Sequence, residues 1–108
     1  MKRQSIVLAM GLSIAGGAQA ALDRAAAEAM MKKDGCAGCH EVDKKLVGPA
    51  FRDVAAKYKG DKDAPARLRD KVKKGGVHVW GEMAMPPNVL ATDADIKELV
   101  DWILTLKK

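Results

Sequence analysis

The sequence predicts an all-α protein built as one small domain of four to five helices. The chain has 108 residues, the length of a single domain. In several segments apolar residues recur at spacings of three and four, the periodicity of a helix with one buried face. No segment alternates apolar and polar residues long enough for a half-buried strand, and residues 77–80 are too few to carry a sheet.

The first 20 residues are predicted to be a cleaved secretory signal peptide. Lys2 and Arg3 give a positive start, thirteen uncharged residues follow from Ile6, and Ala18-Gln19-Ala20 is a small-x-small cleavage pattern. Residues 21–108 then form the mature domain, expected in an oxidising compartment such as the periplasm. No apolar run reaches the roughly 18 residues of a membrane span, so none is expected after cleavage.

The two clearest helical patterns lie at the ends of the mature chain. A helix is predicted from about residue 22 to residue 34, where Gly35 can supply a left-handed cap. Near the C-terminus, Thr92 is the predicted N-cap, with Asp95 three residues later as in a capping box. The predicted buried faces are Leu22, Ala25, Ala26, Ala29 and Met30 in the first helix, and Ile96, Leu99, Val100, Ile103 and Leu104 in the last.

Two shorter helices are predicted between them. Residues 49–58 carry apolar side chains on one face. Residues 63–74 begin with Asp63 as the expected cap and end at two glycines. Residues 44–48 and 80–90 are predicted loops, the second interrupted by two prolines. The apolar positions of the two helices are Phe51, Val54, Ala55 and Tyr58, then Leu68 and Val72.

The mature chain is too small and too poor in aromatic residues to build a large core. Only four aromatic residues are present. A domain of this size buries only roughly 60–65% of its unfolded surface. Such chains usually need a disulfide, a metal or a large apolar cofactor for stability. The composition therefore predicts a further apolar component.

Residues 36–40, Cys-Ala-Gly-Cys-His, form the attachment pattern of a c-type haem. Two thiols on a short turn can add to the two vinyl groups at one edge of the porphyrin, and the next residue then projects an imidazole beneath the iron. This predicts one covalent haem c through Cys36 and Cys39, with His40 as an axial ligand through Nε2.

Three other interpretations of this motif have less support. A thioredoxin-like redox pair needs βαβ surroundings, which the pattern lacks. A structural zinc site needs four ligands. The available ligands are the three in the motif and His78, which is distant in the sequence. A disulfide between Cys36 and Cys39 would close a very small loop and contribute little.

The sixth iron ligand is predicted to be a methionine, because His and Met ligation is the cytochrome c pattern. Met85 is favoured, since the prolines that follow it stiffen the chain. Met83 is predicted to fill a gap in the core but stays open as a competing ligand. Met30 and Met31 are predicted to pack the first helix.

Several motifs together resemble the short bacterial class I cytochromes c, in particular the cytochrome c-551, c-552 or c8 group. The likeness covers nearly all of residues 21–108 in order and approximate spacing. The motifs are Cys36-Ala37-Gly38-Cys39-His40, Val47-Gly48-Pro49-Ala50, Asp53-Val54-Ala55-Ala56-Lys57, Val79-Trp80-Gly81 and Met85-Pro86-Pro87-Asn88.

The resemblance implies roles around the two axial ligands. The carbonyl of Pro49 is expected to accept a hydrogen bond from His40, and Gly48 to let its loop pass close to the ring. Asn88 is expected to donate a hydrogen bond near the sulfur of Met85.

The resemblance also implies contacts at the edge of the haem. The indole N–H of Trp80 and the ammonium of Lys71 are the expected partners of the propionates. Phe51 is expected to pack around the haem, and Trp102 between the terminal helices.

The function that follows is a soluble, monomeric, periplasmic carrier of single electrons, which is not an enzyme. The resemblance implies a quinol-oxidising complex as donor and a nitrite reductase or terminal oxidase as acceptor. Two other classes stay open: a haem enzyme or gas sensor with an open sixth position, and a haem-free structural domain.

Charge distribution bears on the choice of partner. The chain has a net charge of +5, and loss of Lys2 and Arg3 would leave +3. Nucleic-acid binding is not expected, because this charge is modest and no stacking platform is visible. His78 is predicted to be a solvent-accessible loop residue. The central lysines are either a solvated surface or a rim that steers an acidic redox partner: Lys44, Lys45, Lys57, Lys59, Lys62, Lys71, Lys73 and Lys74.

Overall fold

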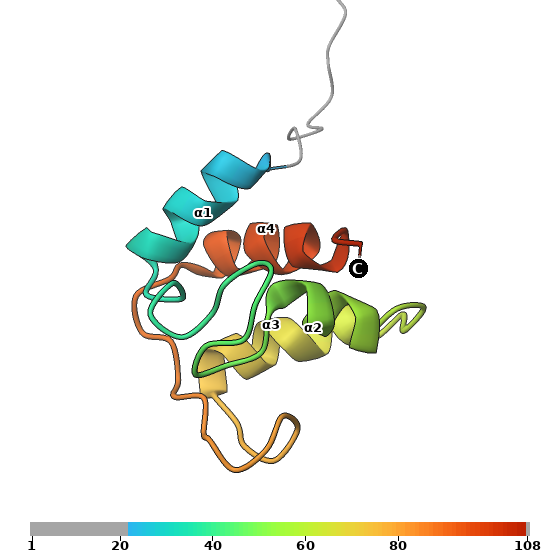
Figure 1. Cartoon of the computed structure of the whole chain (residues 1–108). Helices are drawn as coiled ribbons and strands as arrows, with labels where there is room; N and C mark the ends of the chain where they lie inside the picture. Colours follow the sequence, from blue (N-terminus) through green and yellow to red (C-terminus); the bar gives the residue numbers. More distant parts are fainter. Residues whose placement is uncertain (1–21, 108) are drawn as a thin grey trace, which may run out of the picture.

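The computed structural model describes residues 22–107 as four helices joined by loops (Figure 1). The order is α1 (Arg24–Lys33), α2 (Phe51–Lys57), α3 (Ala64–Lys74) and α4 (Asp93–Leu104). Within these residues there is no strand beyond two isolated bridges, His40 with Lys45 and Gly76 with Met85. The predicted all-α class is therefore confirmed. The predicted signal peptide, residues 1–20, lies outside the described residues.

None of the described helices combines the length and the apolar character that crossing a membrane would require.

Helix α4 occupies the centre of the fold. Figure 1 shows it between α1 on one side and α2 and α3 on the other, and it contacts all three. Trp102 of α4 is buried in a cluster with residues of α1 and α2, which confirms its predicted packing role. The cluster consists of Ala27, Met31, Val42, Phe51, Val54, Leu99, Trp102 and Ile103.

The predicted face of α1 is partly wrong. Ala25, Ala26 and Ala29 are exposed, whereas Ala27 and Met31, one turn apart, face the core. Alanines occur on both sides of this helix, so their spacing does not select a face. Two adjacent methionines do not select it either: Met31 is buried in the core, whereas Met30 is only half-buried.

Side-chain caps set the beginnings of α1 and α4. Thr92 accepts a hydrogen bond from the backbone N–H of Asp95 at 3.1 Å, as predicted. Asp23 accepts one from the N–H of Ala26 at 2.7 Å, a cap that the sequence analysis did not name. After α1, Gly35 takes φ of +80°, the left-handed conformation expected there.

The prediction that the side chain of Asp63 caps α3 is wrong. Asp63 precedes the helix, but its side chain makes no capping bond. Its φ and ψ of −93° and −7° are helical, and an effective N-cap needs an extended backbone. Asp61 forms a turn just ahead of the helix, because its Oδ1 accepts from the N–H of Asp63 at 2.9 Å.

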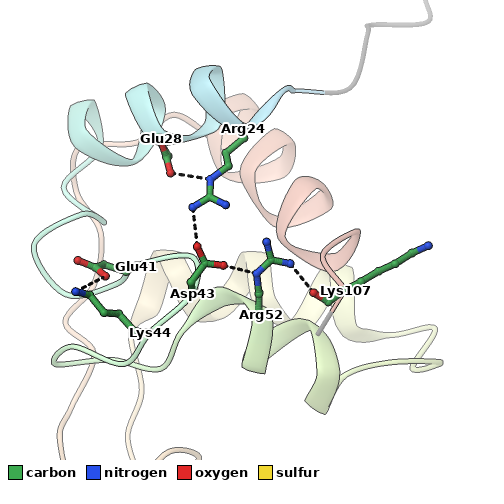
Figure 2. A network of polar contacts seen from close by, with 7 residues as sticks. All are labelled: Arg24, Glu28, Glu41, Asp43, Lys44, Arg52 and Lys107. Atoms are coloured by element: carbon green, nitrogen blue, oxygen red, sulfur yellow. Dashed lines mark hydrogen bonds and ion pairs between the residues drawn. The ribbon is translucent and has the colours of Figure 1, made fainter.

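A surface network of charges holds the segment after the Cys-Ala-Gly-Cys-His motif (Figure 2). Arg24 of α1 donates to Asp43 at 2.8 Å and to Glu28 at 3.0 Å. Arg52 of α2 donates to Asp43 and to the carbonyl of Lys107. Hydrogen bonds from Arg52 and then Arg24 hold the pKa of Asp43 below its ordinary value. The network therefore joins α1, the loop, α2 and the C-terminal residues.

Candidate haem-binding site

A cavity of about 260 Å³ opens beside α2, α3 and α4 and contains most of the predicted site residues. A smaller cavity of about 40 Å³ shares His40 and Met85 with it. All eight predicted site residues line one or both cavities. The larger one is lined by Cys39, His40, Pro49, Lys71, Trp80 and Met85, and the smaller one by Cys36, His40, Met85 and Asn88.

The end of α1 continues directly into the turn that carries the two cysteines. The N–H of Cys36 donates to the carbonyl of Met31 at 2.8 Å. The N–H groups of Cys39 and His40 both donate to the carbonyl of Cys36, at 3.1 and 2.9 Å. No disulfide joins Cys36 and Cys39, both of which belong to the described residues. Burial raises the pKa of the Cys36 thiol.

The imidazole of His40 is held on three sides. Its Nδ1 lies 2.8 Å from the carbonyl oxygen of Pro49, and a carbonyl only accepts, so this nitrogen carries the proton. The ring of Phe51 stacks on it at 4.8 Å between centroids, with 16° between the planes. A Cβ on Gly48 would lie 2.5 Å from Cε1 of His40. In the neutral ring this arrangement makes the lone pair of Nε2 available to bind a metal.

Met85 is held through its backbone. Its N–H donates to the carbonyl of Gly76 at 2.8 Å, and the N–H of Gly76 donates back at 3.0 Å. A Cβ on Gly75 would lie 2.3 Å from the carbonyl oxygen of Met85, so only glycine permits this approach. Gly75 also has φ of +74°. The end of α3 therefore fixes the position of Met85.

Met83 is more exposed than its predicted place in the core would require. Its side chain borders the larger cavity but is 69% exposed, so the prediction that it fills the core is wrong. The physical reason is its place two residues before the Gly76–Met85 pairing, in the exposed part of the loop.

Asn88 joins the Met85 loop to the end of α1. Its Nδ2 donates to the carbonyl of Asp34 at 2.8 Å, and its Oδ1 accepts from the N–H groups of Leu90 and Ala91, both at 2.9 Å. Its own N–H donates to the carbonyl of Val72 at 2.9 Å. These side-chain bonds go to backbone groups within residues 22–107, and the hydrogen bond expected near the sulfur of Met85 stays a prediction.

Replacing Asn88 with alanine is expected to lower the free energy of unfolding by about 1–3 kcal/mol. The carbonyl of the buried Asp34 would lose its donor, and two loop N–H groups would lose their acceptor. Denaturant unfolding of the holoprotein measures the change. Asn88→Asp keeps the acceptor and removes only the donor, so it should lose less. Equal stability of wild type and Asn88→Ala would contradict this role.

The mouth of the larger cavity carries the remaining predicted residues. Trp80 is 38% exposed, and Nζ of Lys57 lies 5.4 Å from its ring centroid. Lys71 is partly buried on α3 and borders the same cavity. His78 is exposed in the loop, as predicted, with Nδ1 3.7 Å from Oε1 of Glu82.

Two functional features were missed by the sequence analysis. Gly75 and Gly76 were interpreted only as a helix stop, although a double glycine can also permit close backbone approach. Asp34 was interpreted as the end of a helix, yet it is only 3% exposed. No local signal predicts that burial, because a polar residue at a helix end is usually solvated.

The site fits a covalently attached haem on the chemistry of its lining. The larger cavity has a mainly apolar lining, an imidazole with a free Nε2 and a thioether, and a thiol at its edge. Imidazole and thioether are established axial ligands of haem iron. The fold and the site together define a small all-helical protein of the c-type haem class.

Comparison with known proteins gives the same class. The model of the Cytochrome c family matches residues 24–107, and the chain belongs to this family. It is 52% identical to cytochrome c-552 of Nitrosomonas europaea over 99 residues, 92% of this chain and 90% of that protein. It is 42% identical to cytochrome c-551 of Pseudomonas aeruginosa over 101 residues, 94% of this chain and 92% of that protein.

A crystal structure of the wild-type Nitrosomonas europaea protein superimposes with a TM-score of 0.71 at 52% identity, covering 74% of this chain and 99% of that one. These findings confirm the class I c-551/c-552 group and a haem c with its iron. The chain is a monohaem electron carrier. Its relatives are small electron-transfer cytochromes, which are not enzymes.

Proposed function

We propose that this cytochrome carries single electrons in the periplasm, with haem iron held between Nε2 of His40 and the sulfur of Met85. One observation carries the ligand assignment: both residues line the same apolar cavity, although they come from the turn after α1 and the loop before α4. Cys36 and Cys39 would hold the ring covalently. The bound haem supplies the one-electron chemistry.

The protein's own contribution is to keep both ligands in place while the charge of the site changes. The carbonyl of Pro49 and the ring of Phe51 fix His40. The pairing with Gly76 fixes Met85. Ligands that do not move keep the reorganisation on electron transfer small. A thioether ligand and an apolar lining both disfavour the more positive oxidised state and raise the potential.

The mouth of the cavity is the proposed contact region for redox partners. Trp80 and Lys71 border it and would reach the propionates, and Lys45 borders it as well. These lysines would attract an acidic partner. Lys44, Lys73 and Lys74 instead form ion pairs with Glu41, Asp93 and Asp70, as an ordinary solvated surface does.

The proposed partners are a quinol-oxidising complex as donor and a nitrite reductase or terminal oxidase as acceptor, with the cytochrome acting as a monomer. The signal pattern of residues 1–20 supports the periplasmic location. Mass spectrometry of the exported protein should find a haem-bearing chain that begins at Ala21. A chain that retains residues 1–20 would contradict export by cleavage.

Spectroelectrochemical titration of the exported holoprotein tests the carrier function. A single reversible one-electron transition is expected, and the reduced protein should not bind carbon monoxide, because Met85 would occupy the sixth position. Ready binding of carbon monoxide would instead indicate an open site, as in a haem enzyme or gas sensor, and would overturn the proposal.

A further inference from the structure

A carboxyl group is buried beside the haem site. Asp34, at the end of α1, is only 3% exposed, and within residues 22–107 no donor reaches its Oδ2. It lines the 40 Å³ cavity together with Cys36, His40 and Met85. An unpartnered oxygen in such a place costs free energy while the group is ionised.

The facing group on α4 is a second carboxyl. Asp95 lines the same cavity, and the two side chains lie within hydrogen-bonding reach of each other. Two carboxylates are both acceptors, so a hydrogen bond between them requires one shared proton. The unpartnered oxygen of Asp34 and the proximity of Asp95 therefore have one explanation, a pair that holds a single proton.

The surrounding charges place the proton on Asp34 and the negative charge on Asp95. Lys33 of α1 forms an ion pair with Asp95 at 2.8 Å, and the side chain of Lys33 is largely exposed. Asp34 lies at the negative end of α1, whereas Asp95 lies in the first turn of α4, at its positive end. The segment 86–91 that packs here has no ionisable side chain, and the remaining titratable groups lining the cavity are Cys36 and His40.

The pKa directions agree with this geometry. Burial, followed by the contact with Asp95, raises the pKa of Asp34 above its ordinary value. The hydrogen bond from Lys33 lowers the pKa of Asp95. The pKa values of the two carboxyl groups are shifted in opposite directions, as expected for a pair that shares one proton.

We propose that Asp34 and Asp95 hold one proton beside the haem site and that loss of an electron from the site promotes its release. The inference rests on the proposed electron-carrier function. On oxidation one electron passes to the partner and one proton passes from Asp34 to water, and on reduction both return. The added positive charge disfavours a nearby proton, so the pKa of the pair is lower in the oxidised protein.

The consequence is a potential that depends on pH. The pair has one pKa in the oxidised protein and a higher pKa in the reduced protein. Between these two values reduction takes up a proton, and the potential falls as pH rises. Below and above that window the pair adds no pH dependence to the potential. The ratio of the two proton dissociation constants is expected to be roughly threefold to tenfold, and a tenfold ratio corresponds to about 59 mV for one electron.

The test compares the potential of the holoprotein against pH with that of Asp34→Asn, an isosteric change that removes the proton. The wild type should show the falling window, and Asp34→Asn should lose it. Asp101→Asn is the matched control, since Asp101 lies on α4 but is paired with Lys97 at 2.8 Å and borders neither cavity. It should retain the window. An unchanged window in Asp34→Asn would assign it to another group and overturn the inference.

Carbon-13 NMR of the aspartate side chains in the reduced holoprotein is the second measurement. One carboxyl should titrate above the ordinary aspartate range and disappear from the spectrum of Asp34→Asn. Asp95→Asn should move that titration to lower pH, because an amide can donate to the Asp34 carboxylate. Ordinary titration of Asp34 would overturn the inference. An irreversible redox titration would instead contradict the carrier function and leave the carboxyl measurement independent.

Discussion

Replacing Met85 with alanine is expected to lower the midpoint potential and to open the sixth position of the iron. The expected fall is on the order of a tenth or more of the roughly 0.8 V range over which axial ligands set haem potentials. The physical reason is the loss of a soft thioether that favours the reduced iron. Redox titration measures the fall, and binding of carbon monoxide to the reduced variant measures the opening.

Met83→Ala is the matched control for this prediction. Met83 borders the same cavity two residues earlier, but it is largely exposed and lies outside the pairing with Gly76. Its loss should change neither the potential nor the binding of carbon monoxide. If Met83→Ala opened the iron and Met85→Ala did not, the ligand would be Met83 and the assignment would be wrong.

Gly48→Ala is expected to displace the imidazole of His40 and to destabilise the holoprotein by about 1–3 kcal/mol, as overpacking does elsewhere. The new Cβ would lie 2.5–2.9 Å from three atoms of the ring. The ring has little freedom to move, because the carbonyl of Pro49 and the ring of Phe51 already hold it. The haem absorption spectrum should change together with the denaturation midpoint.

Gly38→Ala provides the comparison. Gly38 lies inside the Cys-Ala-Gly-Cys-His motif, yet a Cβ there would meet nothing within 4 Å. This variant should keep the wild-type spectrum and nearly the wild-type stability. If Gly48→Ala behaved in the same way, His40 would not be confined from that side, and the account of its orientation would need revision.

Local patterns were sufficient to predict α2 and α4. Phe51, Val54 and Ala55 are buried as their spacing indicated, and Thr92 caps α4. The same reasoning failed for the face of α1, where alanines occur on both sides. It also failed for the cap of α3, because the backbone of Asp63 is already helical. Both failures occur where tertiary packing or turn geometry overrides a residue preference.

In the candidate site, too, residues placed by a local turn could be predicted, whereas contacts between distant segments could not. The cysteines and His40 are predictable because their arrangement depends on one local turn. Met85 could be favoured from its prolines, but the pairing with Gly76 joins two segments distant in sequence. The contact of Asn88 with Asp34 crosses 54 residues, and no periodicity reports such a pair. The burial of Asp34 follows from these distant contacts and was therefore missed.

The central claim is that Nε2 of His40 and the sulfur of Met85 would both bind the iron of the covalent haem. The optical spectrum of the oxidised holoprotein tests it most directly, because a bound thioether gives a weak sulfur-to-iron charge-transfer band in the far red. We expect this band in the wild type and in Met83→Ala, and its loss in Met85→Ala. A wild-type spectrum without the band would contradict the claim.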